Sequence, residues 1–307
     1  MSLASKKVIW AALIGNGLIA ATKFMAALLS GSSAMLSEGI HSLVDTGNQV
    51  LLLYGLKRAQ SPPDEDFPFG HGKEIYFWSF VVAILIFAVG AGISLYEGII
   101  HIIHPSRLEN PRINYIVLAL AVFFEGVAWF FAFREFTRSK GKWGYMEAVR
   151  RGKNPSLFVV LFEDSAAILG LIAAFAGIYL SHTTGNPLFD GLASVVIGLI
   201  LGGTAVWLAY ETKGLLIGES ANQEVVQGIR ILAGSYTQVE TVNEVLTLHM
   251  GPDFILVNIS LDFIDTVPAG QVEDVLEQIR SAIKQRYPEV KRIFAEPRKA
   301  VNQISSD

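Results

Sequence analysis

The residues best suited to chemistry in this chain are His41 and Asp45, four positions apart in an apolar stretch over residues 35–56. On a helix this spacing places both side chains on one face, about one turn apart. A charged group near the centre of a bilayer costs at least about 2.5–3.5 kcal/mol, so an ionisable residue there marks a functional site by default. The pair therefore points to metal or proton chemistry inside a membrane.

A second pair of ionisable residues, Glu163 and Asp164, interrupts the apolar run 157–180. Together His41, Asp45 and Asp164 offer one imidazole nitrogen and several carboxylate oxygens. This donor set suits Zn²⁺ as a four-coordinate ion, and Mn²⁺, Co²⁺ or Fe²⁺ when waters are added. The alternative is a buried His–Asp pair that only joins two helices through a hydrogen bond.

Three further polar residues and the role of Glu163 stay open at this point. Adjacent helical residues point about 100° apart, so Glu163 and Asp164 cannot both face one centre well. Glu163 is a fourth ligand, a partner that orients a ligand, or a proton carrier. Glu38 and Asn48 share the helical stripe of the His–Asp pair, and Glu125 lies in another apolar segment. We expect these three to line a pathway, couple protons or pack helices together.

The composition indicates a membrane protein. Of the 307 residues 51% are hydrophobic and 17% charged, with a mean hydropathy of +0.43, whereas soluble domains carry about 25% charged residues. Cysteine is absent, so any metal must use nitrogen and oxygen ligands. The net charge of −4 argues against nucleic-acid binding. No zinc-protease motif or Ser/His/Asp arrangement is present, so we expect no enzyme and no cofactor.

Six apolar segments are long enough to cross a bilayer as helices, which takes about 20 residues each. They lie at 8–30, 35–56, 75–103, 113–136, 157–180 and 189–211. With the N-terminus inside, the inner loops hold most lysines and arginines, Lys153 among them, while the outer loops hold Arg107 and Arg112. The sequence therefore predicts a transport domain over 1–213 in a bacterial inner membrane, with both termini cytoplasmic.

Residues 214–307 predict a small cytoplasmic α+β domain of ferredoxin-like type. Its elements follow the order αββαβ, at residues 223–234, 244–250, 255–263, 272–283 and 290–295. A domain of this size buries only a modest core, which favours a partner surface. Between the second and third apolar segments, Asp64 and His71 form a possible cytoplasmic loop site for cations, whose alternative is a solvated turn.

Several of these features together resemble the cation diffusion facilitators. They are the six spans, the αββαβ domain, the His-x-x-x-Asp pair and the loop Phe69-Gly70-His71-Gly72-Lys73. The segments Glu163-Asp164-Ser165-Ala166-Ala167 and Gly185-Asn186-Pro187-Leu188 are most similar to the branch that contains the mitochondrial zinc transporter. The resemblance covers nearly the whole chain.

The resemblance implies a homodimeric antiporter that exports Zn²⁺ from the cytoplasm against protons by alternating access. Zn²⁺ is then the transported substrate, with His41, Asp45 and Asp164 at the transport-site positions. The alternatives are an exporter of Mn²⁺, Co²⁺, Ni²⁺ or Fe²⁺, and a non-transporting partner subunit with a degenerate site. The C-terminal domain would serve dimerisation.

Three departures from the family pattern matter. Val160 stands where many members have His or Asp, so the set of four ligands is incomplete unless Glu163 or a water completes it. Phe67 stands at a histidine position of the loop, which weakens the Asp64/His71 site. In the C-terminal domain His249 is the one histidine, which favours dimerisation over metal sensing.

Overall fold

The computed structural model describes residues 3–106, 108, 110–152 and 155–299. Arg107 and Lys153, which entered the orientation argument, lie outside these residues. The chain forms two compact units, one of residues 1–58 with 75–213 and the other of residues 59–74 with 214–307. The division after Lys213 falls where the sequence placed the domain boundary, but the loop 59–74 groups with the second unit.

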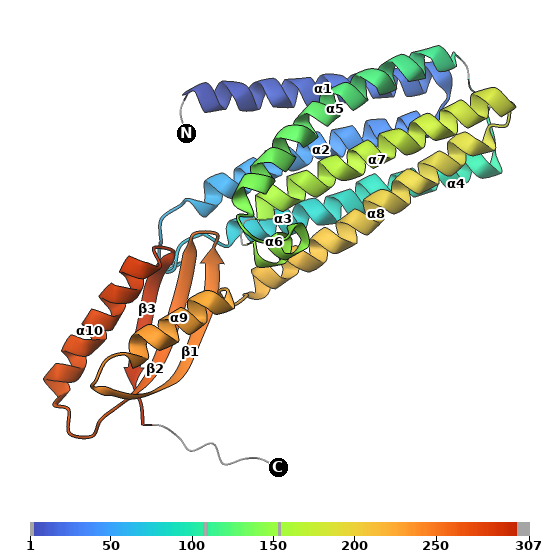
Figure 1. The fold of residues 1–307 in the computed structure, drawn as a ribbon. Helices are drawn as coiled ribbons and strands as arrows, with labels where there is room; N and C mark the ends of the chain where they lie inside the picture. The colour runs from blue at the N-terminus through green and yellow to red at the C-terminus, as the bar shows by residue number, and fades with distance from the viewer. Residues whose placement is uncertain (1–2, 107, 109, 153–154, 300–307) are drawn as a thin grey trace, which may run out of the picture. The chain divides into compact units, whose positions relative to one another are not determined.

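The first unit is a bundle of long helices that run roughly side by side (Figure 1). The chain enters a π-helical turn, η1, between α3 and α4, and these three elements form one continuous span. The elements are α1 (Leu3–Ser30), α2 (Ser33–Ala59), α3 (Glu74–Leu85), η1 (Ile86–Ala91), α4 (Gly92–Ile103), α5 (Pro111–Ser139), α6 (Tyr145–Arg151), α7 (Pro155–Thr184) and α8 (Leu188–Ile217).

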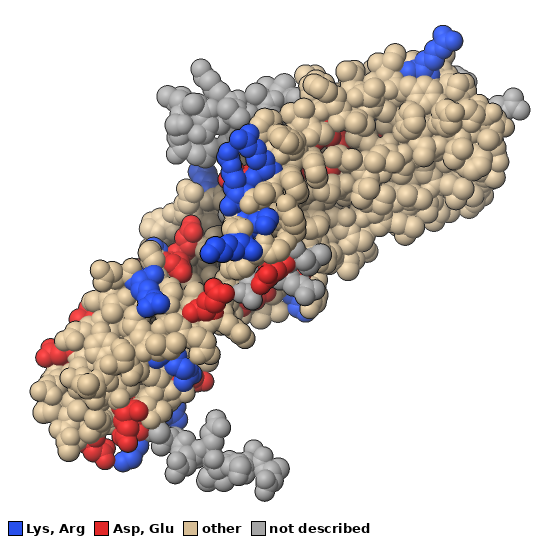
Figure 2. Space-filling model, in the orientation of Figure 1, with Lys and Arg blue, Asp and Glu red and all other residues tan. Residues whose placement is uncertain are grey.

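Within the described residues, four helices are long and apolar enough to cross a membrane: Glu74–Ile103, Pro111–Ser139, Phe158–Thr184 and Leu188–Ile217. Figure 2 shows a face of this unit that is nearly free of charged side chains over most of its length. The other two predicted spans are not confirmed. The described apolar part of α1 is only Asn16–Ser30, and α2 carries ionisable residues along its length, which lower its hydropathy.

Small residues and one carboxylate hold the helices together. A Cβ on Gly98 of α4 would lie 2.7 Å from the Val195 backbone nitrogen of α8, so this close approach requires glycine. Asp190 of α8 is fully buried and caps α2 from outside that helix. Its carboxylate accepts hydrogen bonds from the Ser33 N–H at 2.6 Å and the Ser32 hydroxyl at 2.6 Å. A negative charge at a helix N-terminus is favourable, so α2 starts at a position fixed by α8.

The second unit is a three-stranded sheet with two helices. After α9 (Gln223–Gly234), β1 (Val239–Gly251) and β2 (Phe254–Phe263) pair antiparallel, and after α10 (Ala269–Arg286), β3 (Val290–Pro297) pairs parallel to β2. The predicted αββαβ order is thereby confirmed. The ferredoxin-like label stays a prediction.

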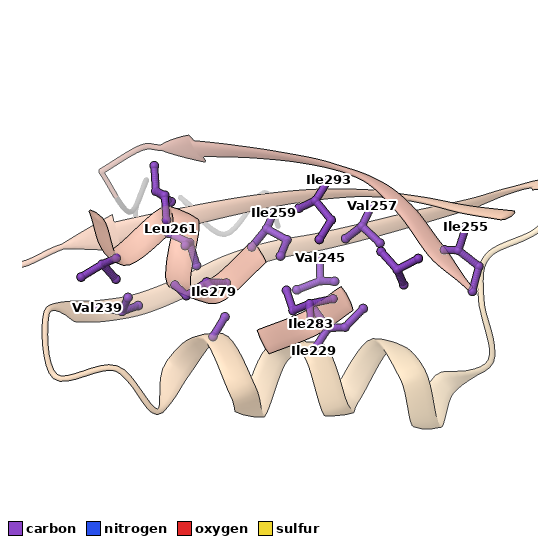
Figure 3. Close-up of a cluster of buried hydrophobic side chains, with 14 of the residues drawn as sticks. Ile229, Val239, Val245, Ile255, Val257, Ile259, Leu261, Ile279, Ile283 and Ile293 are labelled. Carbon is purple, nitrogen blue, oxygen red and sulfur yellow. The ribbon is translucent and has the colours of Figure 1, made fainter. Parts of the chain in front are cut away.

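The core of this unit lies between the sheet and its two helices. Ile255, Val257, Ile259 and Leu261 alternate along β2 and face the helices, where they pack with residues such as Ile279 of α10 (Figure 3). The period-two pattern in the sequence predicted this face correctly.

The substitution Ile279→Ala should lower the free energy of unfolding of the second unit by about 2–5 kcal/mol, because it leaves a cavity in a fully buried position. Hydrogen–deuterium exchange of the full chain should then show faster exchange of β2 peptides and unchanged exchange of α7 peptides. The control is Ile231→Ala, since Ile231 is 72% exposed. Equal exchange in both variants would contradict the described core.

Candidate metal site

A cavity of about 290 Å³ lies within the helical unit and is lined by acidic side chains from three helices. Asp45 comes from α2, Glu125 from α5, and Glu163 and Asp164 from α7. These residues are far apart in the sequence, yet the bundle brings all four to one cavity. Val160, at the position where a further ligand was expected, lines the same cavity with an apolar side chain.

His41 lies next to this cavity, on α2. Its side chain is 1% exposed and its Nδ1 is 3.2 Å from Asp45 Oδ1, as the spacing of four residues predicts. Among the described residues neither ring nitrogen makes a hydrogen bond, and Asp45 Oδ1 makes none either. Buried polar atoms are nearly always satisfied, because leaving one unsatisfied costs about 1–3 kcal/mol. Because both residues belong to α2, the contact between His41 and Asp45 does not itself join two helices.

Glu163 is held by α2 through two contacts. Asn48 Nδ2 donates a hydrogen bond to Glu163 Oε1 at 2.6 Å, and the carboxyl groups of Asp45 and Glu163 are hydrogen-bonded to each other. Although adjacent helical positions diverge, both Glu163 and Asp164 line the cavity. Glu163 is buried and Asp164 is half-buried.

These side chains surround the cavity without forming a ready-made ion site. Within the described part of the chain, no three His, Cys, Asp or Glu side chains are grouped closely enough to hold a metal ion. The ligand roles of His41, Asp45, Asp164 and Glu163 stay predictions.

Lys23 of α1 is the functional candidate that the sequence argument missed. Its ammonium group donates hydrogen bonds to Glu38 Oε2 at 2.9 Å, Ser42 Oγ at 2.8 Å and Glu125 Oε1 at 2.7 Å. The sequence does show a lysine within an apolar segment. That observation does not identify the residues that the lysine contacts. Glu38, predicted to line a pathway, is fully buried and does not line the described cavity. Asn48 also contacts Glu163 instead of lining the cavity.

In the second unit, Asp64 and His71 lie in contact, as the sequence predicted. Their side chains are hydrogen-bonded directly to each other. His71 Nε2 donates a hydrogen bond to Asp64 Oδ2 at 2.8 Å, and the Phe67 N–H donates to Asp64 Oδ1 at 2.7 Å. These two hydrogen bonds hold the pKa of the Asp64 carboxyl below its usual range. Glu74 Oε1 also lies 3.7 Å from His71 Nδ1, and the cation site in this loop stays a prediction.

The two glycines of this loop have distinct backbone roles. Gly70 has a φ of +82°, a left-handed conformation that favours glycine. A Cβ on Gly72 would collide with the Met250 carbonyl, because the loop backbone packs directly against the end of β1. Turn geometry and backbone packing therefore account for the two glycines of the motif Phe69-Gly70-His71-Gly72-Lys73.

Comparison with known proteins connects this architecture to a family. The model of the cation efflux transmembrane domain matches residues 9–217. The mitochondrial proton-coupled zinc antiporter SLC30A9 of Xenopus laevis is 36% identical over 84% of this chain and 46% of its own length, and the human protein is 35% identical over the same shares. The manganese efflux system protein MneP of Bacillus subtilis is 25% identical over 94% of both chains. The chain spans about half the length of the SLC30A9 relatives.

These relatives correct the predicted location. The proteins at 35–36% identity are named as mitochondrial, while the bacterial relatives reach 25%. The prediction of a bacterial inner membrane with cytoplasmic termini is therefore wrong. Its physical basis was the distribution of lysine and arginine, which reports orientation across a bilayer but does not distinguish one membrane from another.

The resemblance to cation diffusion facilitators in the branch of the mitochondrial zinc transporter is confirmed, and so is a multi-pass membrane protein. The cavity of carboxylates beside a buried histidine thus occurs in a fold whose family moves divalent cations across membranes. The chain belongs to the cation efflux family.

Proposed function

We propose that this protein carries Zn²⁺ across its membrane in exchange for protons, as an antiporter and not as an enzyme. The observation that carries the proposal is the set of unsatisfied polar atoms of His41 and Asp45, buried beside a cavity lined by three further acids. A cation that enters the cavity supplies the partner that these atoms lack. The SLC30A9 relatives, named as proton-coupled zinc antiporters, support the choice of ion.

The donor chemistry fits an ion that must bind and then leave. One imidazole and carboxylates bind Zn²⁺ without thiolates, which allows release. The carboxyl groups of Asp45 and Glu163 lie against each other, so in the proposed cycle they hold a proton when no ion is bound and lose it when both bind the ion. Loading with metal therefore releases a proton and unloading takes one up, which is the linkage that antiport requires.

Alternating access is the second element of the proposal. Ligands that do not yet converge must come together as α2 and α7 shift, and such a shift exposes the cavity to one side at a time. The close contact of α4 and α8 at glycine positions makes these two helices a tightly packed pair, and the proposal assigns the movement to other helices.

We further propose that the second unit forms a homodimer interface. Leu246, Asn258 and Phe294 occupy one row across β1, β2 and β3. Residues in such a row project from the same face of a sheet, here the face opposite the core-facing Val257 and Ile259 of β2. Leu246 and Phe294 are each about half exposed, so a second copy of the chain would bury these two apolar side chains.

A second candidate substrate is Mn²⁺. It is favoured by the manganese efflux relative MneP, which aligns over 94% of both chains, and by a donor set in which oxygen outnumbers nitrogen. Competition by Mn²⁺ against Zn²⁺ in the same vesicles distinguishes the two ions.

Asp45→Asn and Asp164→Asn should each abolish zinc-driven proton flux in proteoliposomes, because each removes a charged oxygen ligand from the cavity. The measurement is the fluorescence of a pH dye trapped in the vesicles after Zn²⁺ is added outside. The matched control is Asp253→Asn, because Asp253 is exposed in the second unit. Normal flux in both cavity variants would refute the proposed function.

Val160→His should tighten Zn²⁺ binding by about tenfold or more, since it adds a nitrogen ligand at a position that already lines the cavity. Isothermal titration calorimetry of the purified chain measures the change. Val196→His is the control, because Val196 is 44% exposed on α8 and does not line the cavity. Equal affinities in the wild type and Val160→His would show that residue 160 does not reach the ion.

A further inference from the structure

Lys23 contacts one acid that lines the cavity and one that does not. Its three N–H groups are all used, on Glu38, Ser42 and Glu125. The side chain of Lys23 is fully buried, as is that of Glu38, whereas Glu125 is 17% exposed and lines the cavity. A positive charge of the chain itself therefore lies directly behind one wall of the candidate metal site.

The surroundings of Glu38 show that this cluster is built into the bundle. Glu38 Oε1 packs against Gly170 of α7, where a Cβ would collide with it. Glu38 Oε1 and Glu125 Oε2 are buried, and neither has a hydrogen-bond partner among the described residues. One oxygen of each carboxylate thus accepts a hydrogen bond from Lys23. The positive charge of Lys23 offsets part of the free energy that burying the two carboxylates costs.

We propose that Lys23 is an internal counter-cation that holds Glu125 against α1 and withholds it from the transported ion. This inference rests on the proposed function, because it concerns the same cavity. The ion is then bound by α2 and α7 side chains, and the total negative charge that faces it is lower by one. Lys23 is a positioning residue, since it acts through Glu125.

The test is Zn²⁺ affinity, measured by isothermal titration calorimetry on the purified full chain in detergent. Glu125→Gln should change the affinity less than about threefold, because Lys23 already holds Glu125 away from the ion. Lys23→Met should bind Zn²⁺ at least about tenfold more tightly, because a freed carboxylate attracts the ion. In Lys23→Met/Glu125→Gln this gain should disappear. Lys142→Met, which removes an exposed lysine, is the control.

Lys23→Met/Glu38→Gln covers the case in which Lys23→Met does not fold. It removes one charge of each sign, frees Glu125 from its ion pair, and should also bind Zn²⁺ more tightly than the wild type. Weakening of binding by more than tenfold in Glu125→Gln would overturn the proposal, because Glu125 would then be a ligand. An unchanged affinity in the folded lysine variants would also overturn it, while wild-type binding would leave the proposed function intact. Absence of Zn²⁺ binding in the wild type would overturn both.

Discussion

The cost of burying ionisable groups in an apolar bundle governs the helical unit. Several polar groups on α2 have partners on other helices, because lipid offers none, whereas the ring nitrogens of His41 are left unsatisfied among the described residues. Asp190 of α8 accepts a hydrogen bond from the N-terminus of α2. Lys23 of α1 donates a hydrogen bond to Glu38, and Glu163 of α7 accepts one from Asn48. The helix with the most polar sequence is thus connected to its neighbours by charge and hydrogen bonds, while the more apolar helices pack through small residues.

Much of the fold could be predicted from the sequence because its signals are local. The alternation of Ile255, Val257 and Ile259 identifies a strand with one buried face, and the apolar runs identify four of the spans. The spacing of His41 and Asp45 gives their shared face on α2. Each of these inferences needs only the period of a helix or strand.

The partners across helices could not be predicted in the same way. Lys23 and Glu125 are 102 positions apart, and no period relates residues on different helices. Glu38 shares a stripe with His41, yet it is turned toward Lys23 while the cavity lies beside Asp45. The two unconfirmed spans differ in cause: α1 is described as an apolar helix only over Asn16–Ser30, which is shorter than a span, whereas α2 carries polar residues that lower its hydropathy.

The π-helical turn in the third span changes the helical phase along that span. The Gly92 N–H bonds to the Phe87 carbonyl five residues earlier, so the turn contains one residue more than an α-turn. All later positions are consequently rotated by about 100° relative to an unbroken α-helix. That rotation places the Ser94 carbonyl where the Ser194 hydroxyl of α8 donates to it at 3.0 Å, so one extra residue in the turn sets which face of α4 meets α8.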